Sequence, residues 1–287
     1  MRPPAFDPAL CAQCSAPLAG TYCHRCGQRR LGPEDRTLGH LLREALASWT
    51  NLEGRWIRSL VALVFDTGAL SRAWIEGRRR SYLAPFSLFL LVNLVFFVAP
   101  PMTDFDLHLD DHLGQPFYGE RARAQVGARI AAEDVAYDIF AERFGEASSN
   151  VAKSLVILHV PVLALALLVA FGGRRWTAAE HAVVALHLFA FLLLAAQLVN
   201  WVVLPVVGWL AGLLPEGLGG LPPVGIIALA ILMVGWFRAL RRAYDLGRAP
   251  AAGLLVVAVV GLGVAHLLYR WVQFALVMAL VSAGAPA

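Results

Sequence analysis

Charged residues are scarce in this chain, and their scarcity excludes most soluble proteins. Of the 287 residues, 15% are charged and 59% are hydrophobic, and the mean hydropathy is +0.63. Soluble domains usually carry about 25% charged and about 45–50% apolar residues. The composition therefore predicts an all-α, polytopic helical membrane protein surrounded by a lipid bilayer.

Recognisable catalytic signatures are also lacking. The chain has no nucleophile elbow, no H-E-x-x-H motif, no phosphate-binding glycine loop and no intramembrane aspartate pair. It also shows no internal repeat of the kind that marks the inverted halves of a secondary transporter. These absences favour an interaction, assembly or sensory component. A transporter or channel-like protein and a lipid-acting membrane enzyme stay as alternatives.

Basic residues are only in slight excess, with a net charge of +4. Most of those outside the N-terminal segment lie at predicted membrane edges, where they orient the chain. The overall charge therefore predicts no nucleic-acid partner. The first residues contain no apolar core of the length that a signal peptide requires, so we expect no cleavage ahead of the cysteines.

Cysteine is rare, and its four copies form one pattern. Cys11, Cys14, Cys23 and Cys26 follow the spacing C-x2-C-x8-C-x2-C. Each C-x2-C pair forms a tight turn that directs two sulfurs to one point, and two such turns supply the four thiolates of a closed zinc site. The pattern predicts a structural zinc ribbon in residues 1–30. Disulfides are disfavoured in a reducing cytosol, whereas an iron site of rubredoxin type stays open.

The ribbon is too short to build a hydrophobic core, so a bound metal would supply most of its folding free energy. His24 lies between the third and fourth cysteines. Because four thiolates complete the coordination shell, it is predicted to be a solvated side chain. We expect the ribbon to contact a protein partner. Its basic side chains leave anionic lipid or nucleic acid as alternative contacts.

The longest uncharged run near the N-terminus orients the whole chain. Leu83 to Ala99 are seventeen residues without a charge, and Arg78, Arg79 and Arg80 come shortly before them. A helix of that length approaches the roughly 30 Å thickness of the hydrocarbon core. Basic flanks are retained in the cytoplasm, so the N-terminus is predicted to be cytosolic.

Four further apolar runs alternate with arginine clusters that all fall on the predicted inside. This arrangement predicts a membrane domain over residues 83–287 with five crossings and an external C-terminus, in a bacterial cytoplasmic membrane. The four runs are Ser154 to Phe171, Ala182 to about Leu204, Val224 to Leu240, and Ala251 outward through His266. An outer loop is predicted over 205–223. Residues 272–283, which follow the Tyr269-Arg270-Trp271 triplet, are expected to lie along the membrane or to re-enter it.

Two regions outside these crossings have their own character. Residues 31–82 predict cytosolic or interfacial amphipathic helices, the first from Leu38, then Trp56 to Phe65 and Ala69 to Glu76, which either pack on the membrane domain or contact lipid. Residues 102–152 contain ten acidic residues and four arginines, which predicts an extracytoplasmic acidic loop whose second half is an amphipathic helix.

Polar residues within the apolar runs are candidate sites, because ionisable groups in hydrocarbon are costly. His159 and His266 are predicted to share one depth, with Arg270 above them, as a proton-relay or metal site or as hydrogen-bonding core residues. Glu180 and His187 fall on one helical face. The full set is Asn93, His159, Glu180, His181, His187, Gln197, Asn200, His266 and Arg270.

Several blocks, in this order, resemble the bacterial membrane proteins grouped as domain of unknown function 3667. The blocks are CAQCSAPLAGTYCHRCGQ, NLEGRWIRSLVAL, WIEGRRRSYLAPFSLFLLVNLVFF, AEHAVVALHLFAFLLL and FRALRRAYDLGR. The G-R-R-R-S-Y-L-A-P and E-H-x5-H parts are the more specific ones. The resemblance implies a cytosolic ribbon joined to a multi-span domain of unassigned activity, and it supplies no catalytic residues.

Overall fold

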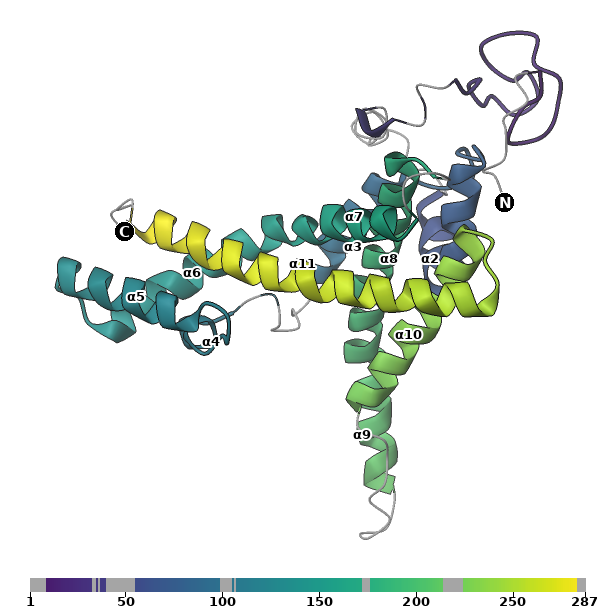
Figure 1. Cartoon of the computed structure of the whole chain (residues 1–287). Helices are drawn as coiled ribbons and strands as arrows, with labels where there is room; N and C mark the ends of the chain where they lie inside the picture. The colour runs from purple at the N-terminus through teal and green to yellow at the C-terminus, as the bar shows by residue number, and fades with distance from the viewer. Residues whose placement is uncertain are drawn as a thin grey trace. The chain divides into compact units, whose positions relative to one another are not determined.

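The structure, a computed structural model, describes residues 9–32, 35, 37–39, 55–98, 105, 107–171, 176–213 and 224–282. Within these residues every regular element is a helix, which confirms the predicted all-helical class, and the remaining backbone pairing is two isolated bridges. The chain divides into two compact units (Figure 1). Unit 1 comprises Met1–Phe96 and Val160–Gly261, and unit 2 comprises Phe97–His159 and Leu262–Ala287. Most of the helix predicted from Leu38, the inner turn with Arg174 and Arg175, and the loop 214–223 lie outside the described residues.

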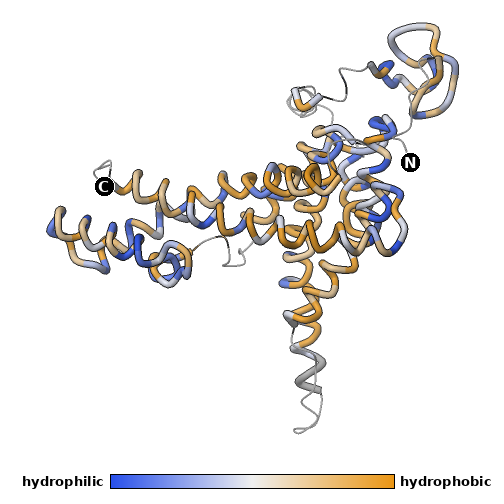
Figure 2. Tube along the Cα trace, in the orientation of Figure 1, coloured by the Kyte–Doolittle hydropathy of each residue, from blue (hydrophilic) through white to orange (hydrophobic). Residues whose placement is uncertain are grey.

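Unit 1 is built around α8 (Ala178–Leu198), which is apolar along its length (Figure 2). The apolar window of its span is 72% buried, against 28% for the two other long apolar spans. Helices α2 (Arg55–Ile75) and α10 (Val224–Ala243) pack against it and against each other. The remaining helices of unit 1 are α3 (Pro85–Val98), α7 (His159–Phe171), α9 (Leu204–Leu213) and the first part of α11 (Arg248–Ser282).

Helix α2 is kinked at the position where the sequence predicts a break. Asp66 has non-helical dihedral angles, φ −154° and ψ 57°. Its Oδ1 accepts a hydrogen bond of 3.1 Å from the backbone N–H of Ala69, which caps the second half of the helix. Its other carboxylate oxygen pairs with Arg242 at the end of α10. The two predicted short helices therefore correspond to the two halves of α2.

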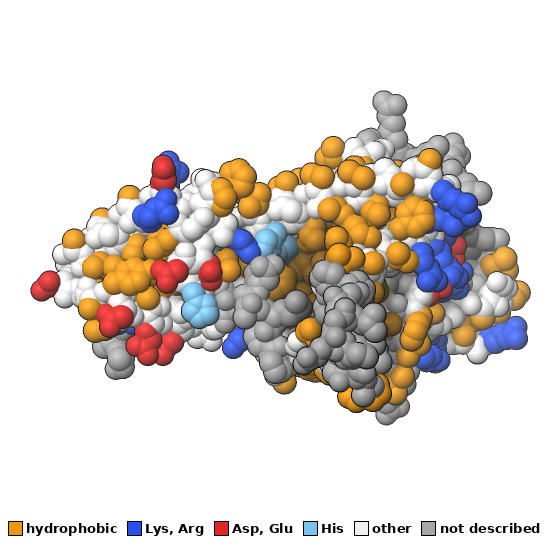
Figure 3. Space-filling view, turned by 90° about the horizontal axis from the view of Figure 1, so that it is seen from below, with side chains coloured by type: hydrophobic (Ala, Val, Ile, Leu, Met, Phe, Trp, Pro, Cys, Tyr) orange, Lys and Arg blue, Asp and Glu red, His pale blue; other side chains and the backbone are white. Residues whose placement is uncertain are grey.

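Unit 2 contains α4 (Leu109–Leu113), α5 (Gly119–Glu133), α6 (Tyr137–Leu155) and the second part of α11. Most of the predicted acidic loop is thus helical, and its acidic side chains gather on the face shown in Figure 3. The single amphipathic helix predicted there is wrong, because Asp134 takes a left-handed conformation with φ 52° and separates α5 from α6. The core of unit 2 consists of Leu109, Ala122, Val126, Phe140, Phe144, Phe274 and Val277.

Three helical spans are long and apolar enough to cross a membrane, whereas the sequence predicts five crossings. They are Tyr137–Phe171, Ala178–Trp209 and Arg248–Val281. Helix α3 has only 14 residues, fewer than the roughly 20 that a spanning helix needs. Helix α10 has 20 residues, but its last turn carries Arg241 and Arg242. These three spans support a membrane protein.

Prolines distort two of these spans without ending them. A short 3-10 helix, η3 (Val156–Leu158), joins α6 to α7 and precedes Pro161. A π-helix, η4 (Val199–Val203), joins α8 to α9 and precedes Pro205. Because proline lacks an N–H and clashes with the preceding turn, the helix rewinds locally instead of stopping. The predicted outer loop therefore begins too early, since α9 continues to Leu213.

Helix α11 also continues beyond its predicted end. The sequence predicts that residues 272–283 lie along the membrane or re-enter it, but α11 runs unbroken to Ser282. Its 35 residues make a helix about 52 Å long, which exceeds the roughly 30 Å hydrocarbon core. Phe274 and Val277 are buried in the core of unit 2, which explains why this segment stays helical.

Gly68 tests the close packing of α2 against α10. A Cβ at this position would lie 2.8 Å from the carbonyl oxygen of Ala239, which belongs to a helix backbone and cannot turn away. We expect Gly68→Ala to lower the free energy of unfolding by about 1–3 kcal/mol. Gly253→Ala is the matched control, because a Cβ there meets nothing within 4 Å. Thermal unfolding in mild detergent measures both, and equal stability of the two variants would contradict this packing.

Candidate functional site

The cysteine module, defined here as residues 9–30, consists of two turns with the same geometry. The N–H of Ser15 donates to the carbonyl of Cys11, and the N–H of Gly27 donates to the carbonyl of Cys23, both at 2.8 Å. Ser15 and Gly27 both have positive φ, 58° and 69°. Each turn is closed by a backbone bridge, Leu10 with Pro17 and Tyr22 with Arg29. The repeated turn is what places two pairs of thiols face to face.

The four thiols form one cluster. Sγ of Cys11 lies 3.5 Å from Sγ of Cys26, and Sγ of Cys14 lies 3.6 Å from Sγ of Cys23. All four sulfurs lie within 4.8 Å of one another, and none forms a disulfide. A tetrahedral zinc site with Zn–S bonds of about 2.3 Å has sulfurs about 3.8 Å apart. The donor set therefore fits one metal ion and leaves no coordination position open.

Backbone amides favour the charged form of one of these thiols. The N–H of Cys26, and then that of Arg25, hydrogen-bond to the sulfur of Cys23 and lower the pKa of its thiol to about 6. A thiolate is the form that binds a metal. His24 is exposed next to this turn and is not one of the clustered ligands, in keeping with its predicted solvated position.

The cysteine module docks on the arginine loop, defined here as residues Gly77–Ser81. The amide of Gln13 donates to Oγ of Ser81 at 2.9 Å, and the amide of Gln28 donates to the carbonyl of Gly77. Gly27 lies beside the guanidinium of Arg80, and its positive φ is the reason that glycine is favoured here. Polar side chains from both cysteine turns thus contact one loop of unit 1.

Asp35 and Arg79 strengthen this contact. Asp35 is completely buried, its carboxylate pairs with Arg29, and its carbonyl accepts a hydrogen bond of 2.7 Å from Arg79. The Arg79 guanidinium lies 3.8 Å from the ring centre of Trp74, a cation–π contact. Arg78 pairs with Glu76. Of the three arginines that were predicted to set topology, Arg80 thus lies beside Gly27 of the cysteine module and Arg79 bonds to Asp35, which follows it.

The buried polar side chains of α8 each have a different partner. Nδ1 of His181 lies 2.8 Å from the hydroxyl of Tyr244, and Nδ1 of His187 lies 2.9 Å from Oγ of Ser71. Gln197 donates to the carbonyl of Phe96 at 2.9 Å. Glu180 forms a capping box with Thr177 at the start of the helix. Because Glu180 and His187 fall on one helical face, they were expected to be able to contact the same neighbouring residue. In the structure they have separate partners.

Two histidines of unit 2 lie side by side, as their predicted common depth implies. Nε2 of His159 is 3.4 Å from Nδ1 of His266, and Nδ1 of His159 is 2.9 Å from the carbonyl of Val156. Because a carbonyl only accepts, His159 donates through Nδ1, and the direction of its contact with His266 depends on the tautomers of the two rings. The rings of Phe105 and Tyr269 pack around the pair, and the Tyr269 hydroxyl donates to the carbonyl of Phe105.

Sequence reasoning missed His112, which it assigned to the solvated acidic loop. The side chain is fully buried, its Nδ1 lies 2.7 Å from the hydroxyl of Tyr118, and it packs on the rings of Phe144 and Phe274. Burial lowers the pKa of His112 to about 4, the charge of Arg270 acts in the same direction, and Asp111 opposes both. The spacing of apolar residues in this acidic segment predicts short helices, and this signal was missed.

Comparison with known proteins supports the family resemblance. Residues 53–97 match the sequence model of a family described as a protein of unknown function, DUF3667, which confirms the resemblance inferred from the sequence. The matched segment contains α2, the arginine loop and α3. No curated protein and no solved structure matches the chain.

The burial of His112 predicts that acid destabilises unit 2. The pKa is 6.5 in the unfolded chain and about 4 in the folded one, so the unfolded chain binds more protons between these values. The contribution of neutral, buried His112 to the free energy of unfolding is therefore fully present above pH 6.5, and it is lost as the pH falls toward 4. We expect a loss of about 2 kcal/mol between pH 7.5 and pH 5 from this group.

Thermal unfolding of the full chain in detergent at these two pH values measures the effect. His112→Phe keeps a ring among the aromatic neighbours and is expected to reduce the pH dependence. His108→Gln is the matched control, because His108 is on the same segment and 83% of its side chain is exposed. A pH dependence that is the same in wild type and His112→Phe would contradict the assignment.

Proposed function

We propose that this chain is a multi-span protein of the bacterial cytoplasmic membrane that acts by binding another protein, with a structural zinc ribbon as its cytosolic contact module. The observation that carries the proposal is the four-thiol cluster docked on the arginine loop. A closed set of four thiolates holds a metal that folds the backbone but offers no position for a substrate. Interaction is the role that such a site supports.

The exposed side chains of the cysteine module suit a contact role. Tyr22 is 65% exposed and Leu10 is 42% exposed, which is unusual for large apolar side chains in so small a module. His24 and Arg25 are also exposed. Aromatic and arginine side chains are enriched where proteins bind one another. The module thus docks through its glutamines and leaves these exposed side chains available to a partner.

The core of unit 2 supports α10 as a crossing. Phe140 and Phe144 come before α7, whereas Phe274 and Val277 come after the first part of α11, yet all four share one core. The two segments must therefore lie on the same side of the membrane, which requires an even number of crossings between them. The apolar spans containing α7, α8 and α11 supply three, so α10 is the fourth.

Contacts along α8 support α3 as the remaining crossing. Phe89 packs on Phe189 with ring centres 6.2 Å apart, and about two turns further the carbonyl of Phe96 accepts a hydrogen bond from Gln197. Helix α3 thus runs parallel to α8 over seven residues of its length. Five crossings with a cytosolic N-terminus then put both segments of unit 2 and the C-terminus outside, in agreement with the positions of the arginine clusters.

The transporter alternative has less support. The buried polar groups of α8 are divided among partners on α2, α3 and the turn after α10, and they do not face a common path. The His159 and His266 pair is the strongest feature in its favour. Its contacts to a backbone carbonyl and between the two rings are also those expected of core histidines that hydrogen-bond within the protein.

One prediction from this proposal concerns the metal and the partner. The intact protein, purified in mild detergent, is expected to hold about one zinc per chain, and Cys11→Ser with Cys14→Ser is expected to lose both zinc and a co-purifying protein. Elemental analysis and mass spectrometry of the co-purified material measure the two quantities. Iron in place of zinc would correct the identity of the metal.

A second variant separates folding of the module from contact by its surface. Tyr22→Ala with Arg25→Glu is expected to retain the zinc and to lose the partner, because both side chains are exposed. Gln115→Ala in unit 2 is the control and is expected to retain both. Capture of the same protein by every variant would contradict the proposed role of the module.

The second prediction concerns α10. A reporter that is fluorescent in the cytosol only is inserted into the full chain after residue 213 or after Gly247. We expect fluorescence from the second insertion and not from the first, because α10 lies between them. The same result at both positions would show that α10 does not cross, and the parity argument from the core of unit 2 would then be wrong.

A further inference from the structure

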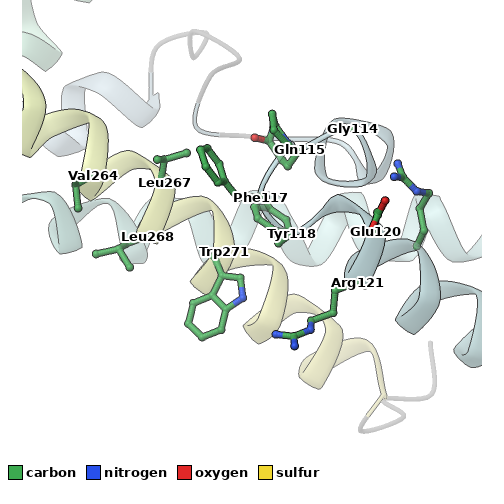
Figure 4. Close-up of a pocket in the computed structure, with 12 residues that line it drawn as sticks. Gly114, Gln115, Phe117, Tyr118, Glu120, Arg121, Val264, Leu267, Leu268 and Trp271 are labelled. Carbon is green, nitrogen blue, oxygen red and sulfur yellow. The ribbon is translucent and has the colours of Figure 1, made fainter.

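Unit 2 contains a cavity of about 620 Å³ between α11 and the segment that leads into α5. Figure 4 shows its two sides, with Leu267 and Trp271 projecting from α11 and with Phe117 and Arg121 on the opposite side. This volume is within the range of about 300–1,000 Å³ that is usual for sites of small molecules. None of the histidines or cysteines described above lines it.

One wall of the cavity is apolar although it is open to the surroundings. Val264, Leu267 and Leu268 are between 40% and 47% exposed, and they belong to a span that is apolar enough to cross a membrane. Phe117, on the loop opposite, is 79% exposed. Water would make such a surface unfavourable, whereas lipid chains would cover it at no cost in hydration. Trp271, 49% exposed at the end of this wall, is a residue type that favours the membrane interface.

The other wall carries positive charge. Arg121 and Arg123 line the cavity against one acidic residue, Glu120. Arg123 is held in place because it donates to the carbonyl of Leu113. Arg121 is exposed, and Figure 4 shows it extending toward the side of α11 from which Trp271 projects. A guanidinium at the interface matches a phosphate group in charge and in hydrogen-bonding geometry.

We propose that this cavity binds an anionic phospholipid of the outer leaflet, with the headgroup phosphate at Arg121 and an acyl chain along Val264 and Leu268. The net charge of the lining selects an anionic over a zwitterionic headgroup, and the apolar wall selects a lipid over free phosphate. The assignment to the outer leaflet rests on the proposed topology. The binding itself does not, because every residue involved belongs to unit 2.

Native mass spectrometry of the full chain in detergent tests the binding. We expect added phosphatidylglycerol to bind more tightly than phosphatidylcholine, and inorganic phosphate alone to give no adduct. Arg121→Gln is expected to weaken phosphatidylglycerol binding about fivefold, as expected for one interfacial charge worth about 1 kcal/mol. Arg129→Gln is the matched control on the same helix, because Arg129 pairs with Glu133 and does not line the cavity.

Unfolding temperatures without added lipid show whether each variant is folded, and Leu268→Ala gives a second, apolar test that is expected to weaken binding of both lipids. Equal affinity for the two lipids, or unchanged binding by folded Arg121→Gln, would overturn the proposal.

The reporter insertions around α10 are independent of these measurements. If they fail while Arg121→Gln weakens binding, the lipid site holds and the proposed topology does not. If they succeed and binding is unchanged, the reverse is true.

Discussion

The constraint on which unit 1 depends is that a polar group inside a membrane protein needs a partner from the protein itself. Because lipid offers no hydrogen bonds, an unpaired buried group costs several kcal/mol. Helix α8 carries four buried polar side chains, and the partners of His181, His187 and Gln197 come from the turn after α10, from α2 and from α3. These bonds fix the rotation and depth of each neighbour on an otherwise apolar helix. The sequence marks these polar residues as candidate site residues. In the structure they instead give the apolar packing of unit 1 a single register.

The same reasoning explains why the two ends of the membrane domain are tied together. Apolar helices can slide along one another at little cost, since lipid and leucine are equally apolar. The aromatic core of unit 2 prevents such sliding, because Phe274 and Val277 of α11 must reach Phe140 and Phe144 of α6. This contact joins segments more than a hundred residues apart in the sequence. A core of seven buried residues therefore constrains the path of the chain between its two halves.

Local patterns were readable from the sequence, and long-range contacts were not. The cysteine spacing, the break at Asp66 and the apolar runs each depend on neighbours a few residues away, so composition and periodicity identified them. The extension of α11 to Ser282 could not be predicted, since it depends on the distant rings of α6. Docking of the cysteine module could not be predicted either, because Gln13, Gln28 and Asp35 have no distinctive pattern until Ser81, Gly77 and Arg79 lie beside them. His112 was missed because it lies in a helix of only five residues, and its acidic neighbours made that segment look like a solvated loop.

The docking contact has a consequence for the metal. A cysteine module of this size would be unfolded without a metal, so the free energy of metal binding would include the free energy of folding. Gln13 and Gln28 contact the arginine loop from the folded turns, and Gly27 of the second turn lies beside Arg80. Docking therefore favours the metal-bound form, and by linkage the metal favours the docked arrangement of the arginine loop. Because that loop joins α2 to α3, a bound metal and the packing of these two helices would stabilise each other, which would make the cysteine module a structural part of unit 1.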